Sequence, residues 1–287
     1  MNTHFDLNGS QLKDYGLDLI DVDWLKQLKK ETLARLKTQS IPSKKDEEWR
    51  YTNIKPLIQK CFELAAKNSI SNLKKDKSFI QEHSDNNIFI YYADGHFCFM
   101  GNLPSYIKTL RTSEDQMIFQ TLLNYDVEKI HTPFADLNTL MLSDVLMIET
   151  LKNQKIDATI HIIICSDVEQ NINPRLLVRL RENSSIRIFE HYLTSNSCVI
   201  NSLTDINCEK NSQLDYYKII DEQEQGYHLS LSNIRLARNS YLNLFSWDCG
   251  ANISRNNINI DLVEKNASVN LNALFFPTGK LHVDNQL

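Results

Sequence analysis

The sequence predicts a mainly β protein: a parallel β-helix, or β-solenoid, preceded by an α-helical N-terminal region. From about residue 156 onward, a two-strand pattern repeats with spacings of 28, 28 and 27 residues. Apolar and polar residues alternate within each repeat, which is typical of strands with one buried face. The chain holds 29 Asn but only 7 Gly, so Asn is expected to form the tight turns. The four repeats are marked by Asn183, Asn211, Asn239 and Asn266.

We expect residues 1–150 to form the N-terminal helical region. Its first helix should start at a cap provided by Asp21 or Asp23. The apolar residues that share one face of this helix are Trp24, Leu25, Leu28, Leu33 and Leu36.

The segment 42–52 combines a hydroxyl residue with a run of acidic residues. Ser43 precedes three acids, so it is expected to cap a short helix whose N-terminal dipole attracts the carboxylates. We interpret the segment as a surface turn rather than a catalytic site, with Trp49 and Tyr51 anchoring it in the core.

The remainder of the N-terminal region is expected to contain a surface connection, a hairpin and two further helices. Residues 68–86 are polar and predict the connection. Residues 87–100 carry two aromatic runs around Asp94-Gly95, a pair that favours a two-residue β-turn. Apolar periodicity predicts helices over residues 113–130 and 133–152.

Residues 151–287 are expected to form the β-helix core, truncated at its C-terminal end. Each repeat holds a strand, an Asn corner and a second strand, and the Asn side chains could bond up the stack as a ladder. Residues 157–162 are interpreted as a degenerate earlier copy. An antiparallel meander is the competing fold, but it favours Gly-rich hairpins. The strands before the corners are expected at residues 176–180, 203–208, 229–236 and 258–263.

Composition argues against several classes of protein. The net charge of −5 provides no basic field for a nucleic acid. The first residues have no secretory pattern, and no apolar run is long enough to span a membrane. The six cysteines lack C-x-x-C or zinc spacing, so we expect reduced thiols in the cytoplasm.

The residues that could take part in catalysis or metal binding are dispersed along the sequence. Nucleotide-binding glycine loops and the G-x-S-x-G elbow are absent from the sequence. His282 and Asp284 would share a strand face, and we expect a structural or interface role for this pair. Cys198, Cys208 and Cys249 are interpreted as small core residues rather than ligands. We therefore assign no catalytic, cofactor-binding or metal residues.

Several motifs together resemble the SufB/SufD scaffolds of the SUF iron–sulfur cluster assembly system. Residues 42–52 are similar to the P-x-K-x-[DE]-E-x-W-[RK]-Y-T signature of SufD, the branch that the chain resembles most. Asn201 and Thr204-Asp205 match the N-x-x-T-[ED] core motif, whereas Val145 stands where the family usually has Gly. The similar segments are residues 42–52, 134–148, 174–217, 253–255 and 282–285.

The resemblance implies a helical N-terminal region, a right-handed parallel β-helix and a C-terminal helical domain. It implies a non-catalytic subunit that works with a SufB-like scaffold and the SufC-like ATPase, while the complex assembles the cluster. The C-terminal domain would lie beyond Leu287. We therefore expect this chain alone to bind neither a cluster nor the ATPase tightly, and its last coil to pair with a second copy or fray. A β-helix polysaccharide lyase or hydrolase is the alternative, but it would need clustered carboxylates and usually a secretion signal.

Overall fold

The computed structural model describes residues 22–65, 84, 86–93, 95–129, 132–166, 168–194, 197–222 and 224–287. The helical elements are α1 (Asp23–Leu36), the short 3-10 helix η1 (Glu47–Trp49), α2 (Lys55–Ala65), α3 (Gln116–Lys129) and α4 (Pro133–Leu140). The first strands are β1 (Asn87–Ala93), β2 (His96–Cys98), β3 (Ile107–Thr109), β4 (Leu146–Glu149), β5 (Lys155–Ser166), β6 (Asn171–Ile172) and β7 (Arg175–Leu180). The later strands are β8 (Ser185–Thr194), β9 (Val199–Cys208), β10 (Gln213–Asp221), β11 (Tyr227–Leu236), β12 (Tyr241–Asp248), β13 (Ile253–Leu262), β14 (Ser268–Phe275) and β15 (His282–Gln286).

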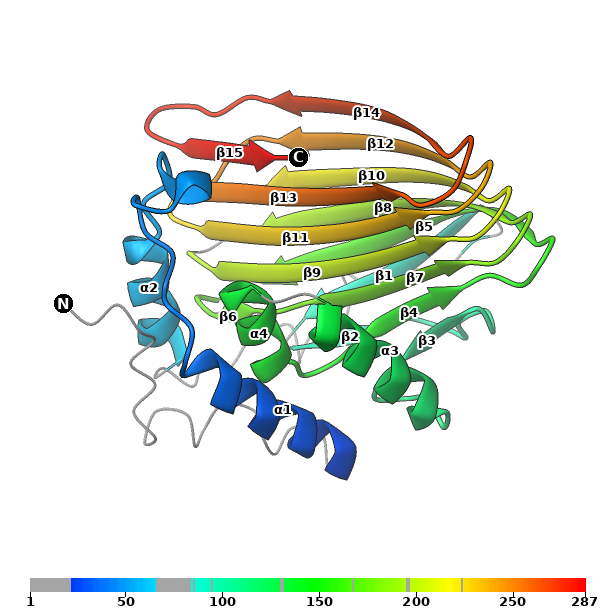
Figure 1. Cartoon of the computed structure of the whole chain (residues 1–287), viewed down its shortest axis with the longest axis horizontal. Helices are drawn as coiled ribbons and strands as arrows, with labels where there is room; N and C mark the ends of the chain where they lie inside the picture. The colour runs from blue at the N-terminus through cyan, green and yellow to red at the C-terminus, as the bar shows by residue number, and fades with distance from the viewer. Residues whose placement is uncertain are drawn as a thin grey trace.

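Two sheets of stacked parallel strands form the solenoid (Figure 1). One sheet runs β14-β12-β10-β8-β5-β1-β2, and the other runs β15-β13-β11-β9-β7-β4-β3. The register is constant from coil to coil, so Ile186 pairs with Leu214, and Leu214 with Leu242. These parallel ladders confirm the predicted β-helix and exclude the antiparallel meander.

The predicted Asn corners are confirmed. Asn183, Asn211, Asn239 and Asn266 have φ angles of 58°, 57°, 58° and 61°, the left-handed conformation that Asn tolerates. Each Nδ2 donates to the Oδ1 of the Asn one coil earlier, at 2.8–3.1 Å. Backbone turns and a side-chain ladder therefore coincide at one corner of the stack.

The first corner lies at Asn153, not in the 157–162 segment that the sequence pattern suggested. Asn153 has φ 63° and accepts the amide of Asn183. Its spacing of 30 residues differs from the others because β5 bulges between Lys155 and Thr159 relative to β8. The bulge changes the distance in sequence between the corner and its strand, and residues 157–162 lie within β5 rather than at a corner.

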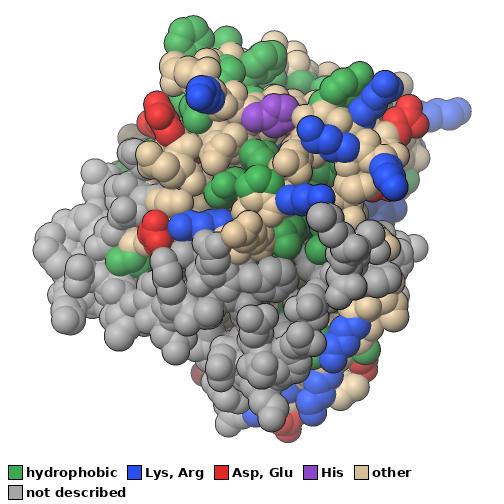
Figure 2. Space-filling model, turned by 90° about the vertical axis from the view of Figure 1, so that its left-hand side faces the viewer, with side chains coloured by type: hydrophobic (Ala, Val, Ile, Leu, Met, Phe, Trp, Pro, Cys, Tyr) green, Lys and Arg blue, Asp and Glu red, His purple; other side chains and the backbone are tan. Residues whose placement is uncertain are grey.

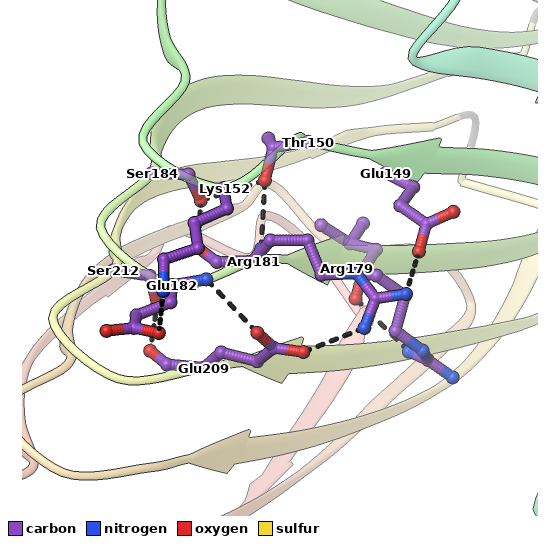
Figure 3. Close-up of polar contacts among 10 residues, drawn as sticks. Glu149, Thr150, Lys152, Arg179, Arg181, Glu182, Ser184, Glu209 and Ser212 are labelled. Atoms are coloured by element: carbon purple, nitrogen blue, oxygen red, sulfur yellow. Dashed lines mark hydrogen bonds and ion pairs between the residues drawn. The ribbon is translucent and has the colours of Figure 1, made fainter.

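Side chains beside the corners reinforce the stack. The hydroxyls of Ser184, Ser212 and Ser240 each donate to the carbonyl three residues earlier, at 2.5–2.7 Å. Figure 3 shows Arg181 between Glu149 and Glu209, at 2.5 and 2.8 Å, so one guanidinium joins three successive coils. Exposed ion pairs of this kind contribute little singly, but here each spans a coil boundary.

The hairpin predicted at residues 87–100 is formed by β1 and β2, with Tyr92 opposite Phe97. Asp94 of its turn lies outside the described residues. Strand β1 also pairs in parallel with β5, and β3 pairs with β4, so strands from the N-terminal half start both sheets. Most of the predicted connection 68–86 lies outside the described residues as well.

The predicted helix 133–152 is wrong beyond Leu140, where α4 ends. Residues 146–149 form β4, whose Leu146, Met147 and Ile148 are fully buried. An apolar run of this length fits a strand covered on both faces as well as a helix, and periodicity cannot separate the two. The predicted helix at 113–130 is confirmed as α3.

Three expectations for the first helices fail. The N-cap of α1 is Val22 without a side-chain bond, and Asp23 is the first helical residue; Asp21 lies outside the described part. Ser43 does not cap η1, whose N-cap is Asp46; the Ser43 backbone N–H donates to Asp46 Oδ2 at 2.7 Å instead. Tyr51 is 79% exposed, whereas Trp49 is buried as expected.

We expect Asn211→Ala to lower the free energy of unfolding by about 1–2 kcal/mol, because Ala pays the steric cost of a left-handed φ. Asn211→Gly keeps the turn and loses only exposed ladder bonds, so its loss should stay below about 1 kcal/mol. Urea denaturation measures both. Equal stability of the Ala variant and the parent chain, or a Gly variant weaker than the Ala variant, would contradict this account.

Candidate functional site

Segments from the two ends of the described chain meet at the last coil. The Thr52 hydroxyl lies 3.0 Å from Nε2 of His282 and donates a hydrogen bond to Oδ2 of Asp284. Both predicted residues therefore sit on one face of β15, as the sequence indicated, and both contact the segment that follows η1. Gln286 Nε2 donates to the other oxygen of Asp284 at 2.7 Å.

Arg255 on β13 contacts both the N-terminal segment and β15. Its Nη1 donates to the Glu48 carbonyl at 2.7 Å and forms an ion pair with Asp284. The guanidinium carbon lies 3.8 Å from the centre of the Trp49 ring, a cation–π contact. Trp49 in turn packs against Phe134 of α4, with ring centroids 5.4 Å apart. We call Glu48, Trp49, Thr52, Arg255 and Asp284 the clasp.

The buried positive charge of the clasp, on Arg255, is paired with the negative charge of Asp284. Arg255 is 2% exposed, so its charge would be costly without a nearby anion. Burial alone would raise the pKa of Asp284, but hydrogen bonds from Thr52 and Gln286 and the charge of Arg255 hold it below its usual value. The arrangement positions the N-terminal segment on the sheet, and its groups are already paired with one another.

The solenoid interior changes from apolar to polar toward the end that carries α2. Tyr192 and Tyr216 donate their hydroxyls to the two carboxylate oxygens of Glu190, which is 2% exposed. Burial, together with the charge of Glu190, raises the pKa of both phenols. Lys218 donates to Ser230, and its ammonium lies 5.3 Å from the centre of the Tyr192 ring.

A second buried pair lies beside this network. His228 Nδ1 is 2.7 Å from Oε1 of Glu222, and both side chains are fully buried. His228 Nε2, Glu222 Oε2 and Thr194 Oγ1 have no hydrogen-bond partner among the described residues. Buried atoms of this kind generally bind ordered water. Asp248 completes the polar end by accepting from Ser254 and Asn256 at 2.6 and 2.9 Å.

Sequence reasoning missed this interior network although a signal was present. In β8 and β10 the inward positions alternate with the outward ones, and Glu190 and Lys218 occupy inward positions between apolar neighbours. The constant 28-residue register places these two opposite one another on adjacent strands. A charged residue at a position where the alternating pattern predicts a buried apolar side chain is therefore the sequence signal for such a network.

The cysteines do not form a cluster. Cys198 immediately precedes β9 and Cys208 is its last residue, so the two are about 33 Å apart at ~3.3 Å per residue. Burial raises the pKa of Cys198 to about 11 and that of Cys208 to about 12. Cys249 follows β12 and accepts from the Trp247 indole at 2.8 Å. Within the described ranges, no three His, Cys, Asp or Glu residues are placed to hold a metal ion.

No disulfide joins the six cysteines, all of which belong to the described part of the chain. None of the helices in that part is both long and apolar enough to cross a membrane.

Comparison with known proteins identifies two matching family regions. Residues 163–287 match the core domain of SufBD proteins of the SUF system for FeS cluster assembly, and residues 13–97 match the SufBD N-terminal region. An iron–sulfur cluster assembly SufBD family protein of Synechocystis sp. is 24% identical over an alignment of 259 residues that covers 84% of this chain. The chain spans 57% of the length of that relative. The clasp joins the two matched regions.

We expect Arg255→Met to lower the free energy of unfolding by about 3–5 kcal/mol, because Asp284 keeps a partly buried charge without its cation. Combining it with Asp284→Asn should cost less than the sum of the two single changes. Urea denaturation of the four proteins measures this coupling. Exposed Arg238→Met is the matched control and should change stability little. Strictly additive losses would show that the ion pair has no net effect.

The clasp should also weaken in acid. Because the folded pKa of Asp284 lies below the unfolded value of about 3.9, its stabilisation is complete above that pH and is lost as pH falls through the lowered folded pKa. The stability difference between the parent chain and Asp284→Asn should therefore stay constant from pH 6 to about pH 5 and shrink as the pH falls from about 4 to 2. A difference that stays constant below about pH 4 as well would refute the assignment.

Proposed function

Because this chain belongs to the SufB/SufD family of the SUF iron–sulfur cluster assembly system, we propose that it is a non-catalytic, SufD-like scaffold subunit. In this proposal it acts with a SufB-like scaffold and a SufC-like ATPase. The cluster is the cargo of the complex, and this chain alone holds none. The proposal includes a cytoplasmic location, where the buried thiols Cys61, Cys198 and Cys208 remain reduced.

The observation that carries the proposal is the joint match of the family's N-terminal and core regions, on segments that touch in the fold. Arg255 and Asp284 of the core region hold Glu48 and Thr52 of the N-terminal region. The charged groups of the clasp are mutually paired, which supports a structural and positioning role for His282 and Asp284.

The partner surface that we propose is the edge formed by β14 and β15. Within the described chain, β14 and β15 each have a strand neighbour on one side only. Such edges can pair with another chain. Hydrophobic side chains gather along the upper edge of the face in Figure 2. The large exposed hydrophobic residues of this coil are Leu274, Phe275, Phe276 and Leu287. We propose that a SufB-like scaffold covers this edge, with a second copy of the chain as the other outcome.

Affinity purification of the tagged chain from its native cell tests the proposal. A SufB-like protein, the ATPase and iron should be recovered together, with the iron in the complex rather than in the isolated chain. Phe276→Asp, at a side chain 69% exposed, should remove these partners without unfolding the chain.

Leu151→Asp is the matched control, since Leu151 is 67% exposed in the turn between β4 and β5, at the other end of the stack. It should keep the partners. Recovery of only a second copy of the chain would replace the SufB-like partner by self-association. Recovery of neither scaffold nor ATPase would reject the proposed role.

A further inference from the structure

The sheet that ends at β14 carries a band of aromatic and aliphatic side chains on its outer face. The constant register aligns them in two neighbouring columns that cross the strands. The first column stacks ring on ring, since the ring centroid of Phe189 lies 4.4 Å from that of Tyr217 and 5.4 Å from that of His161. The first column is Phe89, His161, Phe189, Tyr217 and Phe245, and the second includes Ile163, His191, Ile219, Trp247 and Leu274.

The four α-helices of the described chain pack on the other sheet (Figure 1). Helices α1 and α3 pack with Met147 and Leu177 of that sheet, and α2 and α4 pack with Leu229. The band lies on the opposite side of the solenoid, where Trp247 is 41% and Leu274 48% exposed. A contiguous apolar surface of this kind generally marks a contact with another molecule.

Charged residues beside the band favour a second copy of the chain as that molecule. Arg187 on β8 and Asp215 on β10 are register partners on the outer face, two residues before Phe189 and Tyr217. Arg187 Nη2 and Asp215 Oδ2 lie 3.6 Å apart. A twofold axis that runs along the strands between β8 and β10 exchanges the two strands. It therefore places Arg187 of each copy over Asp215 of the other, so each charge meets an opposite charge in the second copy.

The same axis also matches the apolar side chains. It places Phe189 over Tyr217 of the second copy, since these two residues are register partners on β8 and β10. Between β5 and β12 it places Ile163 over Trp247, which occupy the same column. Two sheets that pack face to face in this way lie about 10 Å apart with their strands aligned within roughly 30°.

The size of the band suits a dimer of moderate affinity. Six of the seven strands, about 4.8 Å apart, and three columns, about 6.7 Å apart, measure roughly 29 Å by 20 Å. This gives roughly 600 Å² per copy and 1,200 Å² in total, the lower limit of the usual range for specific interfaces. We propose that the chain forms a symmetric dimer through the outer faces of β5, β8, β10 and β12, with Arg187 and Asp215 paired across the axis. This face is separate from the β14–β15 edge, and the proposal does not depend on the scaffold role.

Sedimentation velocity of the whole chain over about 1–200 µM is the measurement. The sedimentation coefficient should rise from that of a monomer to that of a dimer, with a Kd on the order of micromolar for an interface of this size. Phe276→Asp alters the β14–β15 edge and should leave this dimer intact. A parent chain that stays monomeric throughout, or a dimer that is lost in the Phe276→Asp variant, would overturn the proposal.

Charge reversal tests the position of the axis. Arg187→Glu should raise the dimer Kd about tenfold or more, because it places a carboxylate over Asp215 of the second copy. Asp215→Arg should weaken the dimer similarly, because it brings two guanidinium groups together. Combining both changes restores opposite charges across the axis, so the double variant should dimerise like the parent chain.

Folding should not obscure this comparison, because the side chains of Arg187 and Asp215 are 48% and 22% exposed. Circular dichroism of each variant checks that the fold is kept. Arg238→Glu is the matched control at an exposed Asn corner outside the band, and it should leave the Kd unchanged. Single charge reversals that dimerise like the parent chain, or a double variant that stays as weak as the single ones, would show that the two copies do not meet on this axis.

Discussion

The left-handed backbone at the Asn corners is the constraint on which the rest of the fold depends. Each corner holds a φ near +60°, and the side-chain ladder fixes each corner above the one before it. A strand that slipped by one residue would exchange its inward and outward faces. Because the corners prevent such a slip, inward positions stay opposite inward positions from strand to strand through the stack.

That register determines where the functional features lie. On the inner face it aligns Glu190 with Lys218 in neighbouring coils, so the polar interior runs across coils rather than within one. On the outer face it places Arg255 directly opposite Asp284 on the next strand. The clasp is therefore a cross-strand pair whose geometry is set by the solenoid, and the N-terminal segment docks on a surface that is already formed.

Much of the solenoid could be predicted from the sequence because its causes are local. The Asn spacing and the alternation determined the strands, the corners and the ladder. The limits are physical as well. The apolar run of β4 fits either a helix or a strand that is covered on both faces. Trp49 and Tyr51 are aromatic residues two positions apart, and their residue types do not show that the first is buried and the second exposed. The spacing of His282 and Asp284, which puts both on one strand face, identified the pair, but their contact with Thr52 depends on docking across more than 200 residues.

The clasp also links the order of synthesis to the completion of the fold. Glu48 and Trp49 leave the ribosome early, whereas Arg255 follows Glu48 by 207 residues. At about 5–20 residues per second, roughly 10–40 s pass before the guanidinium that covers the Trp49 ring is synthesised. Until then this aromatic side chain lacks the cation that covers its ring and the carboxylate that anchors that cation. Docking of the N-terminal segment thus reports that the coil carrying Asp284 has been made and has stacked in place.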